Sequence, residues 1–512
     1  MRTRWKILIG LTVTLAVTLL VSIVHHFQLK FAVERYKAEL KAKGEPMELA
    51  HLIFPPVIQE LNAAEFFTNA FSALSTNQGV LSTNQPAVMK MISPGKAFAG
   101  WQQPFIKDFY GEQASNSWAE IDAALLDEAR GLNLLRQLPA QPVFDFQLNY
   151  QGGFTKMKFS SLTSAKKAVM KLEASASANL RRGDTEMAGK DIRTMLAIVH
   201  GLTHDQILIS ELVRIALLHI ASATTWDFLQ STNTTEAQLE ALQRAWQPIE
   251  IIRPFERAIL VERSVGAIDL KAMRANGLES FIAPLHELGL VDRETGLMAD
   301  LKIKYKSFMW RWWWSYADEL LLLRGEQAAL DALRQLQSNQ SYQSANLELE
   351  KQISILRIAP DSDDSFWFGD PAKADFHFIL SSSVPIFAHA LNKAAKTEAA
   401  LQITICAIAL KRYQLKHGSL PLDLNALVPD YLPTILPDPM NGKTIYYRRN
   451  VAGDFALYSV GENGEDDGGN SSLVEDANPK NLQWQNSKAL DWVWPQPATD
   501  AEINFFHEHP PK

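Results

Sequence analysis

The feature that most constrains this chain is an uninterrupted apolar run close to its start. Residues 7–24 read ILIGLTVTLAVTLLVSIV, 18 positions without a charge. At 1.5 Å per residue a helix of this length extends about 27 Å, close to the hydrocarbon thickness of a bilayer. Arg2, Arg4 and Lys6 precede the run, as is typical of a cytoplasmic N-terminus. The run therefore predicts a transmembrane helix through residues 7–24 rather than a buried core helix.

The residues after the run predict that this helix stays attached to the chain. A cleavable signal peptide has a shorter apolar region and a small-x-small site. Here the run ends in VHHF at residues 24–27, which offers no such site. Basic residues also follow at positions 30–43, so the count of positive charges does not decide the orientation. The short N-terminal tail favours a signal anchor in the inner membrane, with the C-terminal part in the periplasm.

The charge distribution and the single cysteine limit which partners, disulfides and metal sites can be expected. Residues 1–45 carry eight Lys or Arg against three Glu, whereas residues 451–512 carry three Lys against eleven Asp or Glu. A basic start fits a membrane surface, and an acidic end argues against a nucleic-acid groove, so no nucleic acid is expected as a partner. The single cysteine, Cys406, excludes an intramolecular disulfide and metal sites that need several cysteines.

Helical periodicity dominates the middle of the chain. At 512 residues, the chain exceeds what one core usually supports, which predicts two or three domains. Apolar residues recur every three or four positions over 162–180 and again over 188–202. Gly183 can end the first helix and Asp184 can cap the second, which predicts an antiparallel helical hairpin.

Further helices are predicted over residues 206–230, 235–246, 254–275 and 305–336. Within the last of them, charged residues interrupt the aromatic segment at 308–323, which favours a core helix over a second membrane span. By contrast, residues 144–158 alternate enough to predict a small β-hairpin around Gly152-Gly153.

The C-terminal region, residues 385–500, combines a helix, proline-containing turns and a β-hairpin. The segment Ala399–Leu410 is apolar nearly all round, which predicts a central buried helix that ends at Gly418. Turn chemistry at Asp438-Pro439 precedes two predicted strands, over 444–449 and 455–460.

This arrangement closely resembles the C-terminal half of the major pseudopilin of type II secretion systems. The residues that carry the resemblance are Tyr413, His417-Gly418, Pro421, Asp438-Pro439, Tyr446 or Tyr447, and Leu457-Tyr458-Ser459-Val460-Gly461. The chain departs from that family because it lacks the prepilin cleavage site and because residues 46–384 separate the membrane helix from this module. Assembly into a pseudopilus is therefore not expected. The whole chain is also similar to large membrane-anchored proteins of planctomycete and verrucomicrobial type.

In the major pseudopilins the loop after the second strand binds a structural calcium ion. The resemblance therefore implies a calcium site formed by Asn463, Asp466, Asp467 and Asp476. Calcium takes six to eight oxygen ligands, which carboxylates and loop carbonyls can supply. The family has an aspartate where this chain has the neutral Asn463, which implies weaker binding. A solvated acidic loop with glycine turns accounts for the same residues equally well.

Motifs that would indicate catalysis are incomplete. Residues 164–167 match the S-x-x-K motif of penicillin-binding enzymes, but they lie on a predicted amphipathic helix and the S-D-N and K-T-G partners are missing. The sequence at 442–444 ends like a P-loop, but position 437 is proline instead of glycine. No Ser-His-Asp or Cys-His set can be assembled from the sequence.

The expected fold class is mainly α. Its parts are a transmembrane anchor and charged stalk (1–45), a helical body (46–384), a pseudopilin-like α+β module (385–500) and a tail (501–512). The expected function is a membrane-anchored structural or protein-interaction component of the bacterial envelope, linked to a secretion or surface apparatus, with unidentified envelope proteins as partners. The alternatives are an envelope hydrolase with a site in the helical body and a calcium-dependent binding module.

Overall fold

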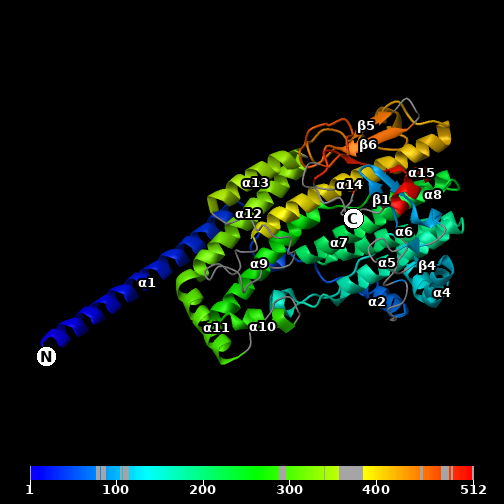
Figure 1. The fold of residues 1–512 in the computed structure, drawn as a ribbon. Coiled ribbons are helices and arrows are strands. Elements are labelled where there is room, and N and C mark those ends of the chain that lie inside the picture. Colours follow the sequence, from blue (N-terminus) through cyan, green and yellow to red (C-terminus); the bar gives the residue numbers. More distant parts are fainter. Residues whose placement is uncertain are drawn as a thin grey trace.

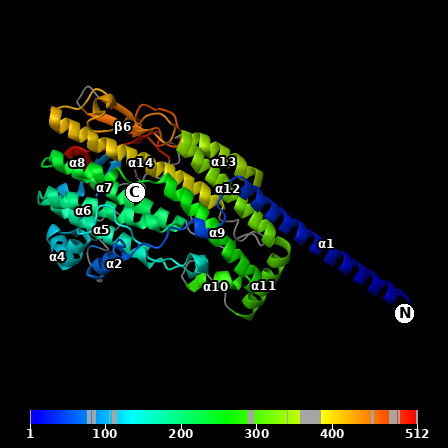
Figure 2. The same cartoon turned by 180° about the vertical axis from the view of Figure 1, so that it is seen from behind.

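The computed structural model describes residues 2–75, 81, 88–103, 106–107, 115–287, 296–339, 341–356, 384–449, 454–473, 484–485 and 488–509. In this part of the chain the protein is mainly helical, with one long helix that projects from an elongated body (Figures 1 and 2). Small sheets contribute little to the architecture. The predicted fold class is confirmed.

The projecting helix is α1 (Arg2–Ala42), and it connects the apolar run to the body without a break. Side chains from Ile9 to Val21 are exposed, whereas Val33 and Leu40 are fully buried against the body. Gly44 adopts a φ of +86° just after the helix, a conformation that favours glycine and ends the helix there.

The predicted helical hairpin is present as α5 (Ser160–Arg181) and α6 (Thr185–Gly201). Gly183 adopts a φ of +80° between them, which a residue with a Cβ would rarely adopt. The side chain of Asp184 accepts a hydrogen bond from the backbone N–H of Met187 (3.0 Å) and so caps α6. The hairpin therefore turns where its glycine and aspartate predict.

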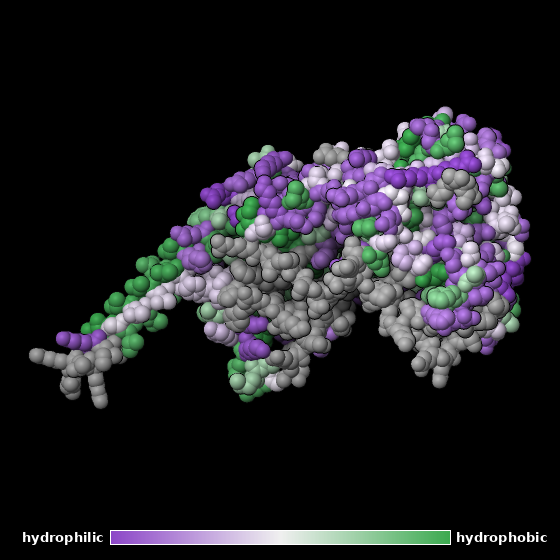
Figure 3. All heavy atoms as spheres, turned by 45° about the horizontal axis from the view of Figure 1, so that its top comes forward, coloured by the Kyte–Doolittle hydropathy of each residue, from purple (hydrophilic) through white to green (hydrophobic). Residues whose placement is uncertain are grey.

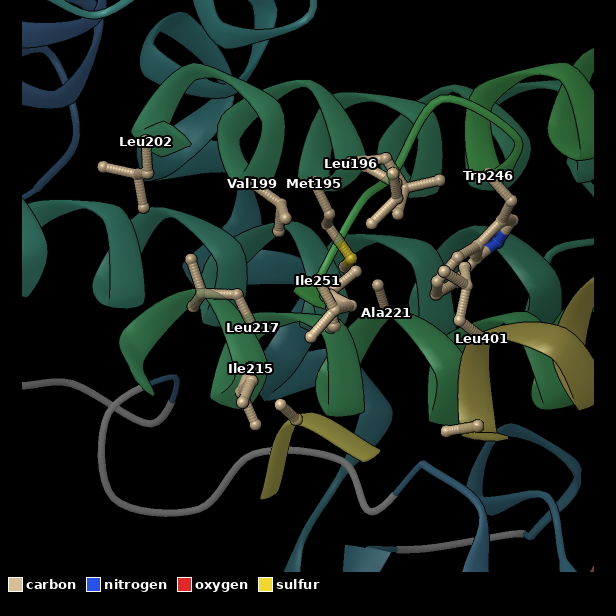
Figure 4. Close-up of a cluster of buried hydrophobic side chains, with 14 of the residues drawn as sticks. Met195, Leu196, Val199, Leu202, Ile215, Leu217, Ala221, Trp246, Ile251 and Leu401 are labelled. Carbon is tan, nitrogen blue, oxygen red and sulfur yellow. The ribbon is translucent and has the colours of Figure 1, made fainter. Parts of the chain in front are cut away.

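The centre of the body is α7 (Leu208–Leu229), which packs against α5, α6, α9 (Ile252–Asn276) and α14 (Val384–His417). Helix α8 (Glu236–Trp246) lies across α6 and α14. Figure 4 shows the apolar side chains that meet here, among them Met195, Ala221 and Trp246. Both α1 and α7 are long and apolar enough to cross a membrane, but most of α7 is buried inside the body. We therefore treat α7 as a core helix.

The other α-helices complete the body around this centre. They are α2 (Ala64–Ser72), α4 (Trp118–Leu135), α10 (Glu279–Glu287), α11 (Leu297–Met309), α12 (Ser315–Asn339), α13 (Tyr342–Leu356) and α15 (Asp500–Glu508). A π-helical turn, η6 (Trp310–Trp314), joins α11 to α12. The helix predicted over 305–336 is thus helical throughout, but this turn interrupts its regular geometry.

Strands form three small sheets in the described residues. The first contains β1 (Lys90–Ser93), β2 (Lys96–Phe98) and β8 (Gln496–Pro497), and the second contains β3 (Ile106–Lys107) and β4 (Ser115–Asn116). The third contains β5 (Tyr446–Arg449), β6 (Phe455–Ser459) and β7 (Trp492–Val493), with Tyr446 opposite Tyr458. The predicted C-terminal hairpin is β5–β6, slightly shorter than expected.

The hairpin predicted over residues 144–158 is wrong. Two 3₁₀ turns occupy this segment, η3 (Tyr150–Gly152) and η4 (Phe154–Lys156). The Asn149 side chain accepts from the Gly152 N–H (3.0 Å), and Asp269 accepts from the Phe154 N–H (2.9 Å). These side chains satisfy backbone donors that a strand would have paired, so the alternation of residue types does not produce a ladder.

Candidate functional site

The first candidate is the acidic loop that follows β6. At the start of this loop, the buried carboxylate of Asp438 connects the Asp438-Pro439 turn to the end of strand β6. Asp438 accepts from the backbone N–H groups of Met440 and Val460 (both 3.0 Å) and from the hydroxyl of Ser459 (2.8 Å). Asp438 is therefore a structural residue that fixes where the loop begins.

Asp466, a predicted calcium ligand, is held by donors of the protein itself. The Tyr458 hydroxyl donates to Oδ1 (2.8 Å), as does the Gly468 N–H (2.9 Å), and the Arg448 guanidinium donates to Oδ2 (2.9 Å). Partial burial alone would raise the pKa of Asp466, but these hydrogen bonds and the positive charge lower it below its usual value. A guanidinium at this carboxylate opposes the approach of a cation.

The other predicted ligands are only partly brought together. The Asn463 amide donates to Asp467 Oδ2 (2.8 Å), so these two side chains are neighbours. Asp476 lies outside the described residues. Within the described part of the chain, no group of three or more His, Cys, Asp or Glu side chains has an arrangement suited to a metal ion. Calcium binding by this loop therefore stays a prediction.

Asp491 lies just before β7 and binds the backbone of this loop, a contact that sequence analysis missed. Its Oδ2 accepts from the N–H groups of Gly469 (2.8 Å) and Asn470 (3.0 Å). Burial raises the pKa of Asp491 to about 6, despite the backbone donors that lower it. Oδ1 is buried and has no well-formed hydrogen bond with a described residue. Because Asp491 lies beyond the loop, no spacing in the sequence connects it to Asp467.

Buried titratable groups in the helical body are the next candidate, since a hydrolase would need some of them. Asp145 lies 3.9 Å from His204, and burial raises the pKa of the adjacent Asp205 to about 8. However, Asp145 accepts from the backbone N–H of Val57 (3.2 Å) and of Gln147 (2.9 Å). This cluster holds the segment that leads from α1 into the body, which is a structural task.

A surface cavity lies between α9, α12 and α14. It has a volume of 230 Å³, and Glu250 and Glu398 are among the residues that line it. Burial raises the pKa of Glu398 to about 7. The lining contains no serine, cysteine or histidine. The cavity therefore offers carboxyl groups without a nucleophile or an imidazole base beside them.

The third candidate is the junction, which we define as residues 25–42 of α1 together with η6 and the first turns of α12. The imidazole Nδ1 of His26 donates to the backbone carbonyl of Trp312 (3.0 Å), and the His26 ring packs against Trp312 and Tyr316. The His25 ring lies 5.9 Å from the ring of Trp313. The end of the apolar run thus meets a cluster of aromatic rings.

The π-helical geometry of η6 separates its tryptophans into two environments. Trp310 is fully buried, and its indole N–H donates to Asp318 (2.9 Å). Trp312 points outward and is 45% exposed. π-helical turns in otherwise regular helices occur frequently at functional sites. Here the turn lets one tryptophan hold the core while another reaches the surface beside α1.

Ion pairs fix the second half of α1 to the body. Glu319, almost fully buried on α12, lies 2.6 Å from the ammonium of Lys37 and 2.6 Å from the guanidinium of Arg274. Glu45, just after α1, pairs with Arg334, and this hydrogen bond lowers the pKa of Glu45. A carboxylate removed from water in this way needs such partners, so the junction has one defined geometry.

No protein-family model matches the chain, and neither a curated protein nor a solved structure shows significant similarity to it.

Proposed function

We propose that the protein is a single-pass, membrane-anchored structural or interaction component of the bacterial envelope, with its body in the periplasm. The proposal rests on one observation: along the unbroken helix α1, the apolar side chains change from exposed to buried. From Ile9 to Val21 the apolar side chains of α1 are exposed, whereas Val33 and Leu40 are buried in the body. Apolar side chains that are exposed along most of an 18-residue apolar run are stable in lipid and costly in water.

The position of the C-terminal module supports a role in binding other proteins. Strands β5 and β6 lie beside α14, toward the end of the body that is far from the exposed part of α1 (Figures 1 and 2). A module in this position would face the periplasm at a distance from the membrane. The proposed link to a secretion or surface apparatus rests on the resemblance of this module to the pseudopilins.

Membrane location and orientation are tested together by cysteine labelling. The native Cys406 is buried, so it contributes little background. Leu422→Cys, on the module, should react with a membrane-impermeant maleimide in spheroplasts, and Trp5→Cys should react only after permeabilisation. The protein should remain in the membrane pellet after alkaline carbonate extraction. Release of the full-length chain by carbonate would refute the anchor, and the reverse labelling pattern would refute the orientation.

The interaction role is tested by photo-crosslinking in living cells. A photoreactive amino acid at Leu422, an exposed position of the module, should form a discrete adduct with an envelope protein. The same amino acid at Leu126, an exposed position of α4, serves as the matched control. Equal adducts at both sites, or none at Leu422, would count against a specific partner of the module.

A calcium-dependent binding module is the second candidate, favoured by the carboxylate of Asp491, which is buried close to Asp467. The carboxylates of Asp467 and Asp491, with loop carbonyls, would hold the ion, and the ion would order the loop. Calcium, but not magnesium, should then raise the melting temperature of the protein. Asp467→Asn should abolish this shift, while Asp430→Asn, an exposed residue outside the loop, should leave it unchanged. No calcium-dependent shift in the wild type would remove this candidate.

A further inference from the structure

Helix α11 exposes an unusually large apolar face. Six large side chains on α11 and the adjoining η6 turn are 45–78% exposed: Leu297, Met298, Leu301, Tyr305, Phe308 and Trp312. Their spacing of one, three, four, three and four residues places them on one side of a helix. Large apolar side chains gathered in this way indicate a surface that contacts something other than water.

The opposite side of α11 faces the body, so the apolar face points away from it. The Ser307 hydroxyl accepts from the backbone N–H of Leu278 (2.9 Å), and Trp310, three residues on, is fully buried. Ile303 packs against the main core. These residues lie on the side opposite Leu301 and Phe308. The outward direction of the apolar face is thus fixed by packing behind it.

The apolar face lies at the end of the body from which α1 leaves. Helix α11 runs across the direction of α1 in both ribbon views (Figures 1 and 2). Figure 3 shows hydrophobic surface along the projecting α1 and a second hydrophobic area at the lower edge of the body. The contact between His26 and Trp312 joins the two directly. Trp312, at one end of the apolar face, therefore lies beside α1.

Aromatic rings occupy both ends of the apolar run. Trp5 is exposed near the N-terminus, and His26 meets the rings around Trp312. Between positions 5 and 26 a helix rises about 32 Å, which matches the hydrocarbon thickness of a bilayer. Tryptophan and tyrosine are enriched at both membrane–water boundaries. Trp312, which contacts His26, is therefore at the depth expected for one boundary.

The charges of α11 also favour a lipid surface. Lys302 and Lys304 flank the apolar face, and Asp300 is the single acidic residue among residues 297–309. An amphipathic helix with lysines beside an apolar face is typical of a helix that lies in the headgroup region. Lysines near an anionic bilayer surface strengthen such contacts. The charges and the exposed apolar side chains of α11 therefore both favour a lipid bilayer as the surface that this helix contacts.

We propose that α11 and η6 form a second membrane contact, in which the apolar face enters the headgroup region of the leaflet on the body's side of the bilayer. Leu301 and Phe308 would reach the acyl boundary, and Lys302 and Lys304 would meet lipid phosphates. This proposal rests on the membrane anchoring proposed above. It adds that the body lies against the bilayer rather than being connected to it by α1 alone.

The test uses the full chain in vesicles of phosphatidylcholine and phosphatidylglycerol. Leu301→Cys carries an environment-sensitive NBD label, with Leu15→Cys in the span and Leu126→Cys on α4 as matched controls. Spin-labelled lipids quench NBD within the bilayer. We expect shallow spin labels to quench position 301, deep ones to quench position 15, and neither to quench position 126.

The outcomes separate this proposal from the anchoring proposal. Quenching at position 15 without quenching at position 301 would overturn the second contact and leave the anchor intact. No quenching at position 15 would overturn the anchor. A blue-shifted label at position 301 that no spin-labelled lipid quenches would indicate a protein occupant, such as a second copy of the chain, and would also overturn the proposal.

A charge-reversal pair tests the role of the lysines. Lys302→Glu with Lys304→Glu should weaken partitioning of α11 into anionic vesicles by at least about five-fold per lysine, because each change removes an attraction and adds a repulsion. The quenching at position 301 should fall accordingly. The control pair, Lys166→Glu with Lys167→Glu on the exposed side of α5, should leave it unchanged. Equal quenching in both pairs would overturn the electrostatic part of the proposal.

Discussion

The buried ion pair between Glu128 on α4 and Lys171 on α5 gives the sharpest test of how the helical body is held together. The Lys171 ammonium lies 2.6 Å from Glu128 Oε1 and donates to the Ser75 carbonyl (2.8 Å). Glu128 Oε2 accepts from the Ser75 N–H (2.9 Å). The two side chains are only 9% and 5% exposed. Lys171→Met would leave the carboxylate buried without its counter-charge, at a cost of about 3–5 kcal/mol.

This cost can be converted into a melting temperature. The unfolding entropy is about 2.1 cal/mol/K per residue, or about 1.1 kcal/mol/K for 512 residues that unfold together. Lys171→Met should therefore lower the melting temperature by about 3–5 °C, as measured by calorimetry in detergent. Glu128→Met with Lys171→Met removes both charges and should cost only about 1–2 kcal/mol, mainly through the two backbone groups of Ser75. A double variant less stable than the single Lys171→Met variant would refute the reasoning.

Three further predictions concern buried groups elsewhere in the protein. Asp438→Ala should lower the melting temperature by about 3 °C, because three hydrogen bonds are lost at about 1 kcal/mol each. It should also increase hydrogen exchange at Ser459 and Val460 more than Asp438→Asn does. Burial raises the pKa of Glu173 to about 8, so its contribution to stability is complete below the unfolded pKa near 4.5 and is lost as pH rises through 8. Between these two pKa values, the free energy of unfolding should fall by up to about 1.4 kcal/mol per pH unit. Glu173→Gln should flatten this decline. Parallel pH profiles of the wild type and the variant would contradict a raised pKa at Glu173. Burial raises the pKa of Cys406 to about 12, so the thiol should react with a disulfide reagent at pH 8 only after denaturation, and rapid reaction of the native protein would disagree with its position.

The local elements of the fold could be predicted because short-range rules determine them. The turn at Gly183-Asp184 follows from a glycine that accepts positive φ and from an aspartate that caps the next helix. The apolar run at residues 7–24 is unmistakable for the same reason, since every member is a neighbour in sequence. The failure at residues 144–158 shows the limit of such rules, because Asp269, far along the chain, satisfies a backbone donor of that segment.

The arrangement of the junction could not be predicted, because it depends on pairings between distant elements. The segment 308–323 belongs to the core at Trp310, whose buried indole donates to Asp318. The expectation of a core helix was nevertheless only half right, as Trp312 and Phe308 are exposed. Nothing in the sequence places Trp312 beside His26, nearly three hundred residues away.

The acidic loop likewise has some features that its own sequence predicts and others that depend on distant residues. Its glycine turns and acidic residues were evident, but the donors that occupy Asp466 come from β5 and β6 through Arg448 and Tyr458. Which carboxylates remain available for a cation depends on this pairing. Asp491 reaches the loop only because β7 joins β6, a connection for which the sequence carries no recognisable signal.

The continuity of α1 has a mechanical consequence. If α1 spans a membrane as proposed, tilting of this unbroken helix carries the body with it, because Glu319 holds the second half of α1 to the body. A helix tilts further when the bilayer becomes thinner than its apolar length. The β5–β6 module at the far end would then sweep through an arc, so that membrane thickness itself would set the height at which any docked partner is held.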